Sequence, residues 1–473
     1  MVEFVYEDPK QGGVKDVYFS PDRSYVVAFY RKQLDTAGRE RIEEIVGNYR
    51  QRIFEQAGGE YWKNIFCWPD KIVEYNGKLG VVMPTYDKAF FFSSGILAGA
   101  EKEGKWFASA KNFNKFIPPK ERGALNNYIR ICLTLSRGVR RLHAAGLAHS
   151  DLSYKNCLVD PSSGRACIID VDGLVVPGRF PPDVLGTPDF IAPEVVQSYG
   201  TENPKTPCRE TDLHALATLI YFYLLHRNPL DGSKVWSQDD QEQRKLETGE
   251  KALFIEHPTD PTNRLIPSPD EAELMPWRDP VKLPYTTTGP YLSELIERAF
   301  VDGLHNPSMR PIAGEWEDAL IKTSDLLLPC ANPKCVKKFF VYNNQMNPVC
   351  PYCGTAYTLP VAVLDLYYSP RGSQYISEKR RIVVWSGQSL YKWHVDRSVT
   401  PNERISPEDC KRVGYFQYHK NQWFLVNQTS TDMWNVSTNQ QIQPGQAVAL
   451  TNGLKILLSK KPTGRLVNVM ITK

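Results

Sequence analysis

The chain has 473 residues, of which 42% are hydrophobic and 23% are charged. These are the proportions of a soluble globular protein, and the length indicates two to four domains. The net charge of +4 is too small to make nucleic acid the expected main partner. The N-terminus has no apolar signal segment, and the most apolar window, residues 213–225, is too short to span a bilayer. We therefore expect a cytoplasmic protein without a membrane partner.

The first 86 residues predict strands and one helix. Two β-rich runs within residues 12–32 flank Pro21-Asp22-Arg23, which is the pattern of a hairpin. Residues 37–57 carry apolar side chains at helical spacing. Residues 71–75 and 79–83 flank an Asn-Gly pair, which indicates a second hairpin.

The middle of the chain predicts two long helices. Residues 125–145 alternate apolar positions at spacings of three and four, and Gly146 is placed to end that helix. The apolar window 213–225 indicates a buried helix. Residues 96–122, by contrast, are rich in Gly and Lys with interspersed aromatic residues. They form either an extended insertion or a further helical region, and a solvated loop is the favoured interpretation.

Three short motifs lie close together between residues 149 and 194. The first, HSDLSYKN, places Asn156 five residues after Asp151. The second, IIDVDG, contains Asp170, and the third, GTPDFIAPE, ends at Glu194. In this order and spacing they resemble the catalytic loop, the magnesium-binding segment and the APE motif of the protein kinase superfamily. The resemblance implies a bilobal kinase fold and transfer of the ATP γ-phosphate to protein hydroxyls.

The resemblance also implies a role for each polar residue of these motifs. Asp151 would orient the substrate hydroxyl and accept its proton, and Lys155 would neutralise the γ-phosphate. Asn156 and Asp170 would hold Mg²⁺, because hard oxygen ligands suit a hard cation. Asp172 stands where the glycine of the motif belongs. It would either add a second carboxylate near the metal or leave the turn to the next residue.

The lysine that binds the α- and β-phosphates is missing from its usual strand. With the first hairpin turn at its proline, Val17 pairs with Val26, and Ala28 falls on the lysine position. Lys32 lies too far along the strand unless the loop is unusually long. The segment GGVKDVY resembles the with-no-lysine kinases, in which a lysine from the Gly-rich strand takes over. Lys15 is therefore the expected ATP lysine.

Other residues complete the expected nucleotide site. Gly12, Gly13 and Val17 match part of a Gly-rich phosphate loop. Met83 falls at the gatekeeper and hinge, although a plain core role fits it equally well. The predicted helix offers four glutamates as the partner of the lysine, and the sequence does not choose among them: Glu40, Glu43, Glu44 and Glu55.

Two departures from the kinase pattern concern regulation. Ser150 replaces the arginine that usually pairs with a phosphorylated activation segment, and residues 174–185 contain no Ser, Thr or Tyr. We expect activity without phosphorylation of this segment. Thr187 matches the position that contacts the catalytic Asp in Ser/Thr kinases, while Lys155 matches the tyrosine kinase layout. Ser/Thr specificity is our interpretation.

Distant residues are expected to anchor these motifs. Asp212 matches the buried aspartate that holds the catalytic loop backbone in kinases, although a simple N-cap role is also open. Arg310 matches the arginine that forms a buried ion pair with the glutamate of the APE motif, here Glu194. Residues 228–285 are longer than a minimal kinase needs, and their role is open.

Four cysteines follow the kinase-like region. Cys330 and Cys335 are separated by four residues, Cys350 and Cys353 by two, and a strand-like FFVY lies between the pairs. Four thiolates at this spacing are typical of a structural Zn²⁺ ribbon.

Residues 360–473 contain many short strand-like runs with turns between them, which predicts a β-sandwich. The run from WFLVN to TNGLKILLS resembles the later strands of a forkhead-associated domain. Gln388 follows Gly387 where such domains carry Gly-Arg, so we expect that phosphopeptide reading is lost. The whole order resembles a bacterial kinase family found with tellurium-resistance-type von Willebrand factor A proteins and metal-dependent protein phosphatases. That resemblance implies both proteins as partners.

The combined prediction is an α+β chain in four parts. Residues 1–86 form the kinase N-lobe, 87–326 the C-lobe, 327–359 the zinc ribbon and 360–473 the forkhead-associated-like sandwich. We expect a Ser/Thr protein kinase that uses ATP and Mg²⁺ on protein substrates. The alternative is a pseudokinase scaffold that binds nucleotide and assembles the phosphatase and the von Willebrand factor A partner.

Overall fold

The computed structural model divides into two compact units, residues 1–320 and 321–473. It describes residues 2–7, 9–55, 58–176, 178–182, 185–268, 274, 276–370, 372 and 374–472. The named strands of this part of the chain pair antiparallel, and most of its helices are grouped between residues 105 and 324, which confirms the α+β class. None of the helices among these residues combines the length and the apolar character needed to cross a membrane.

A five-stranded antiparallel sheet opens the first unit, with the strand order β1-β2-β3-β5-β4. Both predicted hairpins are confirmed: β2 pairs with β3, and β4 pairs with β5. The strands are β1 (Lys10–Gln11), β2 (Lys15–Phe19), β3 (Tyr25–Tyr30), β4 (Lys71–Tyr75) and β5 (Lys78–Pro84).

The register of the first hairpin differs from the predicted one by two residues. Val17 pairs with Ala28 rather than with Val26, and Lys15 pairs with Tyr30. The hairpin loop is longer than predicted because Asp22 builds it: its Oδ1 accepts hydrogen bonds from the Ser20 and Ser24 side chains and from the Ser24 backbone N–H. The position expected for a β3 lysine is therefore occupied by Tyr30 and not by Ala28.

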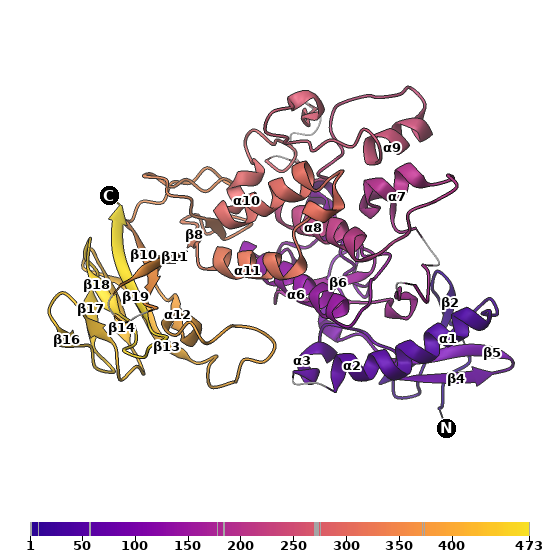
Figure 1. Ribbon diagram of the computed structural model, residues 1–473, viewed down its shortest axis with the longest axis horizontal. Helices are drawn as coiled ribbons and strands as arrows, with labels where there is room; N and C mark the ends of the chain where they lie inside the picture. The colour runs from indigo at the N-terminus through magenta and orange to yellow at the C-terminus, as the bar shows by residue number, and fades with distance from the viewer. Residues whose placement is uncertain are drawn as a thin grey trace. The chain divides into compact units, whose positions relative to one another are not determined.

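The predicted helix at residues 37–57 consists of α1 (Thr36–Glu44), a π-helical turn (Ile45–Tyr49) and α2 (Arg50–Phe54); residues 56 and 57 lie outside the described residues. The Asp35 carboxylate caps α1 by accepting from the Gly38 N–H at 2.7 Å. Ile42 packs against the sheet in one cluster with Leu79 and Val81, so α1 runs beside β5 (Figure 1). A short helix, α3 (Gly59–Lys63), follows.

The rest of the first unit is mainly helical. Helices α6 and α8 contact each other in its interior (Figure 1), and α8 is buried along almost its whole length. The helices are α4 (Lys105–Ala108), α5 (Ala110–Lys115), α6 (Leu125–Ala144), α7 (Pro193–Ser198), α8 (Arg209–Leu225), α9 (Asp240–Thr248), α10 (Pro290–Glu297) and α11 (Ala313–Ser324). The two predicted long helices are thus confirmed.

Of the two interpretations left open for residues 96–122, the structure agrees with the helical one, and the favoured solvated loop is wrong. Helices α4 and α5 lie there, and Phe107 and Phe113 are fully buried. Lys102 is also buried, because it pairs with Asp160 at 2.9 Å and with Glu121 at 3.2 Å. Burial of a lysine is tolerated only with such compensation.

The second unit combines a small cysteine-bearing hairpin with two antiparallel sheets around one apolar core. The hairpin is β8 (Leu327–Pro329) and β9 (Phe339–Val341). The six-stranded sheet has the order β11-β10-β19-β18-β15-β16, and the four-stranded sheet β12-β13-β14-β17. Their strands are β10 (Val361–Tyr368), β11 (Ile376–Val384), β12 (Ser389–Tyr391), β13 (Arg412–His419), β14 (Gln422–Asn427), β15 (Trp434–Asn435), β16 (Gln440–Gln441), β17 (Ala447–Ala449), β18 (Lys455–Leu457) and β19 (Arg465–Thr472), with helix α12 (Lys392–Val395) after β12.

Candidate active site and metal centre

The loop that carries Asp151 is fixed from below by helix α8. The buried Asp212 carboxylate accepts a hydrogen bond from the His149 backbone N–H at 2.8 Å and contacts His143 Nε2 at 3.0 Å. Asp212 is not the N-cap of α8, because Cys208 occupies that position. Of the two roles open from the sequence, the structure therefore shows the anchoring of the loop.

Asp151 is held on both carboxylate oxygens. Oδ1 accepts the Thr187 backbone N–H at 2.7 Å, and Oδ2 accepts the Asn156 amide at 2.9 Å. The predicted contact between Thr187 and Asp151 is confirmed, although it runs through the backbone; the Thr187 hydroxyl contacts Ser153 Oγ at 3.2 Å. These two donors fix the direction of the carboxylate.

A short hairpin brings Asp170 next to this loop. Strands β6 (Cys157–Asp160) and β7 (Arg165–Ile168) pair with Cys157 opposite Ile168. The pairing continues one residue further, because the Ile169 N–H donates to the Asn156 carbonyl at 3.0 Å. Asp170, the next residue, therefore lies beside the catalytic loop. Its φ of 59° lies in the left-handed region, which aspartate tolerates better than most residues.

A cavity of about 190 Å³ connects these groups to the N-terminal sheet. Its lining includes Asp151 and Asp170 together with Lys15, Tyr30 and Arg41. The Asp170 side chain is 53% exposed, so its oxygens remain accessible. Such half-exposed hard oxygens beside the catalytic loop fit Mg²⁺, and Asn156 and Asp170 are the residues that would hold it.

Lys15 is buried in this cavity between two carboxylates. Its Nζ lies 2.6 Å from Asp172 Oδ2 and 3.2 Å from Asp170 Oδ1. Burial by itself would lower the pKa of Lys15, but the Coulombic attraction of Asp172 and Asp170 outweighs it and raises that pKa. Burial by itself would raise the pKa of Asp172, but the charge of Lys15 outweighs it and holds the pKa of that carboxyl below its usual range. The two residues form one buried ion pair.

Among the described contacts, none of the four candidate helix glutamates reaches Lys15. Glu40, Glu43 and Glu55 are exposed, and Glu44 pairs with Arg179 at 3.0 Å. The α1 side chain that lines the cavity beside Ile42 is Arg41, whose Nη2 donates to the Pro181 carbonyl at 2.6 Å. The helix thus presents a cation where a glutamate was expected.

The remaining predicted nucleotide residues lie around the first hairpin. Gly12 and Gly13 form the turn between β1 and β2, and both carbonyls accept from Arg31. Val17 and Met83 pack partly buried against the sheet cluster that contains Ala28. Neither is among the residues lining the 190 Å³ cavity. Met83 thus makes the contacts expected of a plain core residue.

Lys155 and Lys32 are both exposed. Lys155 lines a larger cavity of about 630 Å³ with Tyr154 and Asp189, on the C-terminal side of the catalytic loop. Lys32 follows the end of β3, and neither lysine lines the Lys15 cavity.

The APE glutamate is tied to the end of the helical region. Arg310 donates to both oxygens of Glu194, at 2.8 and 2.7 Å. Its guanidinium also donates to three backbone carbonyls, those of Gly303, Glu210 and Leu304. The predicted buried ion pair is therefore confirmed.

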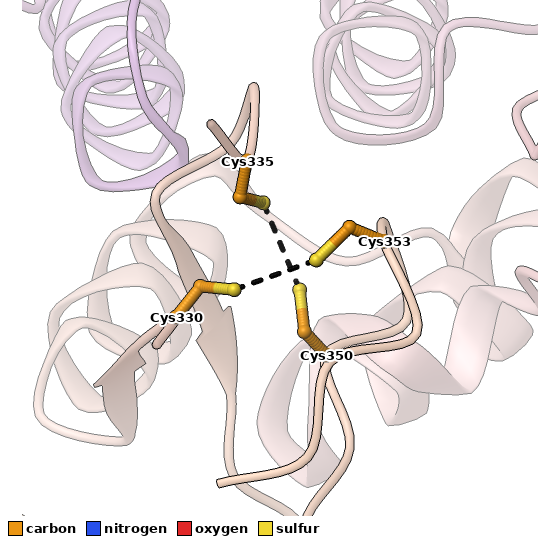
Figure 2. A group of neighbouring side chains, drawn as sticks. All are labelled: Cys330, Cys335, Cys350 and Cys353. Carbon is orange, nitrogen blue, oxygen red and sulfur yellow. Dashed lines mark hydrogen bonds between the residues drawn. The ribbon is translucent and has the colours of Figure 1, made fainter. Parts of the chain in front are cut away.

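The four cysteines converge on one point (Figure 2). The closest sulfur pairs are Cys330 with Cys353 at 3.5 Å and Cys335 with Cys350 at 3.8 Å, and all four sulfurs lie within 4.8 Å of one another. Sulfurs bound tetrahedrally at about 2.3 Å from Zn²⁺ stand roughly 3.8 Å apart. The donor set and its spacing therefore fit a closed four-thiolate metal site.

Two site residues escaped prediction from the sequence. Tyr30 donates its hydroxyl to Asp172 Oδ2, and Arg41 lines the same cavity. The sequence could have indicated Tyr30, because Tyr30 becomes the direct strand partner of Lys15 once the hairpin loop is lengthened by two residues. Arg41 carried no such signal, since only the rotation of the helix decides which residue faces inward.

Comparison with known proteins agrees with this geometry. Residues 107–296 match the family model of the protein kinase domain, a segment that contains Asp151 and Asp170 but not Lys15. The serine/threonine-protein kinase PkaB of Streptomyces coelicolor is 28% identical over 115 residues, which cover 22% of this chain and 26% of that protein.

Two further relatives show similar matches. The putative tyrosine-protein kinase C03B1.5 of Caenorhabditis elegans is 29% identical over 127 residues, covering 25% of this chain and 35% of that protein. The probable serine/threonine-protein kinase CCRP1 of Zea mays is 32% identical over 120 residues, covering 24% and 18%. The chain thus spans between 18% and 35% of the length of these three relatives. The matches support placing it in the protein kinase superfamily.

Proposed function

We propose that the protein is a Ser/Thr protein kinase that transfers the ATP γ-phosphate to protein hydroxyls. The observation that carries the proposal is the fixed Asp151 carboxylate, held by Thr187 and Asn156 in one cavity with Lys15 and Asp170. Mg²⁺, when bound at Asp170 and Asn156, would neutralise charge on the phosphates.

The chain's own residues supply the rest of the chemistry. Asp151 accepts the proton of the substrate hydroxyl, and its two hydrogen bonds keep the acceptor aimed into the cavity. Lys15 binds the phosphates of the nucleotide as a cation delivered from β2. Thr187, packed against Ser153 beside Asp151, supports Ser/Thr rather than Tyr specificity. Lys155, which is exposed on the catalytic loop, is proposed to neutralise the γ-phosphate.

We also propose that phosphorylation of the activation segment does not control this kinase. The segment is tied to α1 by two contacts, Arg41 with the Pro181 carbonyl and Arg179 with Glu44. Its start pairs with the catalytic loop, because Val175 and Ala148 exchange backbone hydrogen bonds at 2.8 and 3.0 Å. Treatment with a broad phosphatase should leave the transfer rate unchanged.

The second unit is proposed as a partner-binding region. Zn²⁺ at Cys330, Cys335, Cys350 and Cys353 would close the β8–β9 hairpin, and the two sheets would form a forkhead-associated-like module. We propose a von Willebrand factor A protein and a metal-dependent protein phosphatase of tellurium-resistance type as its partners. Failure of both to co-purify with the full chain, or their equal co-purification with a chain truncated after residue 326, would contradict this assignment.

The central experiment is phosphotransfer from γ-labelled ATP to a generic protein substrate, with phosphoamino acid analysis of the product. Wild type should label Ser and Thr. Lys15→Ala and Asp151→Ala should lose transfer by roughly 10²–10⁴-fold. Lys32→Ala is the matched control and should keep it, because Lys32 is exposed outside the cavity. Loss in Lys32→Ala with full activity in Lys15→Ala would refute the lysine assignment.

The alternative function is a pseudokinase scaffold that binds nucleotide without transfer. The observation that favours it is the pairing of Lys15 with Asp170, which engages the phosphate-binding cation and the metal ligand with each other. A wild-type chain that binds ATP but labels no substrate, with and without both partner proteins, would decide for the scaffold.

A further inference from the structure

We infer that Asp172 replaces the helix glutamate as the carboxylate that positions Lys15, with Tyr30 completing the arrangement. Lys15, Tyr30 and Asp172 are called the lysine cluster below. The inference deepens the proposed function, because it rests on Lys15 as the residue that binds the nucleotide phosphates. It assigns Asp172 a positioning role rather than a metal-ligand role.

The geometry of the lysine cluster supports this inference directly. Lys15 and Tyr30 are register partners on β2 and β3, so their side chains leave the sheet on the same face. Lys15 Nζ lies 5.4 Å from the Tyr30 ring centroid and 2.6 Å from Asp172 Oδ2. The Tyr30 hydroxyl donates to that same oxygen. Asp172 Oδ2 therefore fixes the side chains of both Lys15 and Tyr30.

The burial of the cluster makes the contact specific. The side chains of Lys15 and Asp172 are 11% and 3% exposed, whereas the Asp170 side chain is 53% exposed. A buried pair in low dielectric is screened little by salt, while a contact to an exposed carboxylate is easily exchanged for solvent. Asp172 is thus the permanent partner of Lys15, and Asp170 is the one that can turn to a metal ion.

The helix cannot supply this carboxylate in the described structure. Arg41 is its cavity-lining ionisable residue, and Arg41 donates to the Pro181 carbonyl of the activation segment. Asp172 therefore supplies Lys15 with the counter-charge that the helix does not. The substitution of the motif glycine by Asp172 and the displacement of the lysine to β2 therefore belong to one arrangement.

The first test measures the lysine itself and requires no catalysis. The full-length wild type, Asp172→Asn, Tyr30→Phe and the control Glu43→Gln are treated with limiting acetic anhydride, and acetylation of Lys15 relative to Lys32 is read by mass spectrometry. Loss of the 2.6 Å contact with Asp172 should release the Lys15 side chain and increase its acetylation several-fold in Asp172→Asn. Tyr30→Phe should give a smaller increase, and Glu43→Gln, an exposed helix glutamate, no change.

The second test measures ATP. Asp172→Asn should raise KM for ATP about tenfold with a smaller change in kcat, the effect of losing one charge-assisted contact. In a Lys15→Ala background the same substitution should add no more than about twofold, because both changes remove one interaction. A purely structural defect would instead multiply with Lys15→Ala.

Three results would overturn the inference. The first is unchanged Lys15 acetylation in Asp172→Asn. The second is a larger effect in Glu43→Gln than in Asp172→Asn. The third is a shifted Mg²⁺ requirement in Asp172→Asn with normal acetylation, which would make Asp172 a metal ligand. If no form of the protein transfers phosphate, the proposed function fails, but the acetylation result still decides whether Asp172 positions Lys15.

Discussion

Replacing Arg310 by Met should lower the free energy of unfolding of the first unit by about 3–5 kcal/mol, the range for breaking one partner of a buried ion pair. Arg310 is 1% exposed in its side chain and donates to Glu194 twice and to three backbone carbonyls. Met keeps most of the packed methylene volume, so the loss reports these five hydrogen bonds and the charge. Five hydrogen bonds at roughly 1 kcal/mol each, together with the loss of the ion pair, would sum to a larger cost. We expect the lower value because water can enter the site and replace some of these bonds.

The two partners of this ion pair should respond unequally. Glu194 is 23% exposed, so water can solvate what remains after Glu194→Gln, and the amide retains one acceptor for Arg310. We expect that variant to cost about 1–2 kcal/mol. The control is Lys63→Met, which removes an ion pair with Glu60 whose side chains are 53% and 87% exposed, and it should cost less than about 0.5 kcal/mol.

The assay is urea denaturation of the full chain combined with hydrogen exchange of α7 and α8, which reports stability locally. The double variant should lose less than the sum of the single losses, because both substitutions remove the same interaction. A cost below about 1 kcal/mol for Arg310→Met, or a larger cost for Glu194→Gln than for Arg310→Met, would refute the ion-pair reasoning.

Three further predictions concern other parts of the chain. The purified protein should carry one Zn²⁺ by metal analysis. Cys350→Ser should lose this ion together with the protection of β8 and β9 in hydrogen exchange. Cys410 is an exposed cysteine outside the cluster, and Cys410→Ser should change neither the metal content nor the protection. Burial lowers the pKa of His394 despite its contact with Asp325, so the unfolded chain binds a proton at this histidine more readily than the folded chain does. The contribution of His394 to the stability of the second unit is therefore full above pH about 6.5 and is lost as the pH falls below it. His394→Gln should abolish this loss in a pH series of denaturation curves. Gly104→Ala should destabilise the first unit by about 1–3 kcal/mol in thermal unfolding, since its Cβ would stand 2.0 Å from the Tyr223 hydroxyl. Gly47→Ala, whose Cβ would meet nothing within 4 Å, should cost less.

The catalytic motifs were predictable because their chemistry is dense and local. Asp151, Asn156 and Asp170 fall within twenty-two residues of His149, and the β6–β7 pairing that joins them needs only a short loop. Asp212 and Arg310 were found from the motif frame, although the partners of Arg310 are far apart in sequence.

The register of the first hairpin was not predictable by the same means. A shift of two residues leaves every side chain on its original face, so the alternation of apolar and polar residues does not detect it. The deciding contacts are those of Asp22 with Ser20 and Ser24, which stabilise a loop longer than the proline alone indicates. The error moved the expected lysine position from Tyr30 to Ala28, and with it the partner of Lys15.

The misread region at residues 96–122 has a different cause. Its Gly and Lys content suggests solvent, but α8 and the β6–β7 hairpin lie beside it and supply both an apolar surface and charges. The Gly104 N–H donates to the Cys157 carbonyl at 2.8 Å, and Lys102 reaches Asp160. Composition within a window cannot register partners that come from more than fifty residues away.

The unusual residues of the active site are explained together by charge balance. With Lys15 of β2 in its proposed nucleotide role, Tyr30 stands on the usual lysine position of β3, and an uncharged phenol there needs no glutamate on α1. The helix is then free to carry Arg41, which holds the activation segment through the Pro181 carbonyl. That contact does not depend on pH or on a phosphate, since a guanidinium stays charged and a carbonyl needs no modification. Under the proposed function, control would therefore act on access to the site or on partner binding, and not on charging the segment.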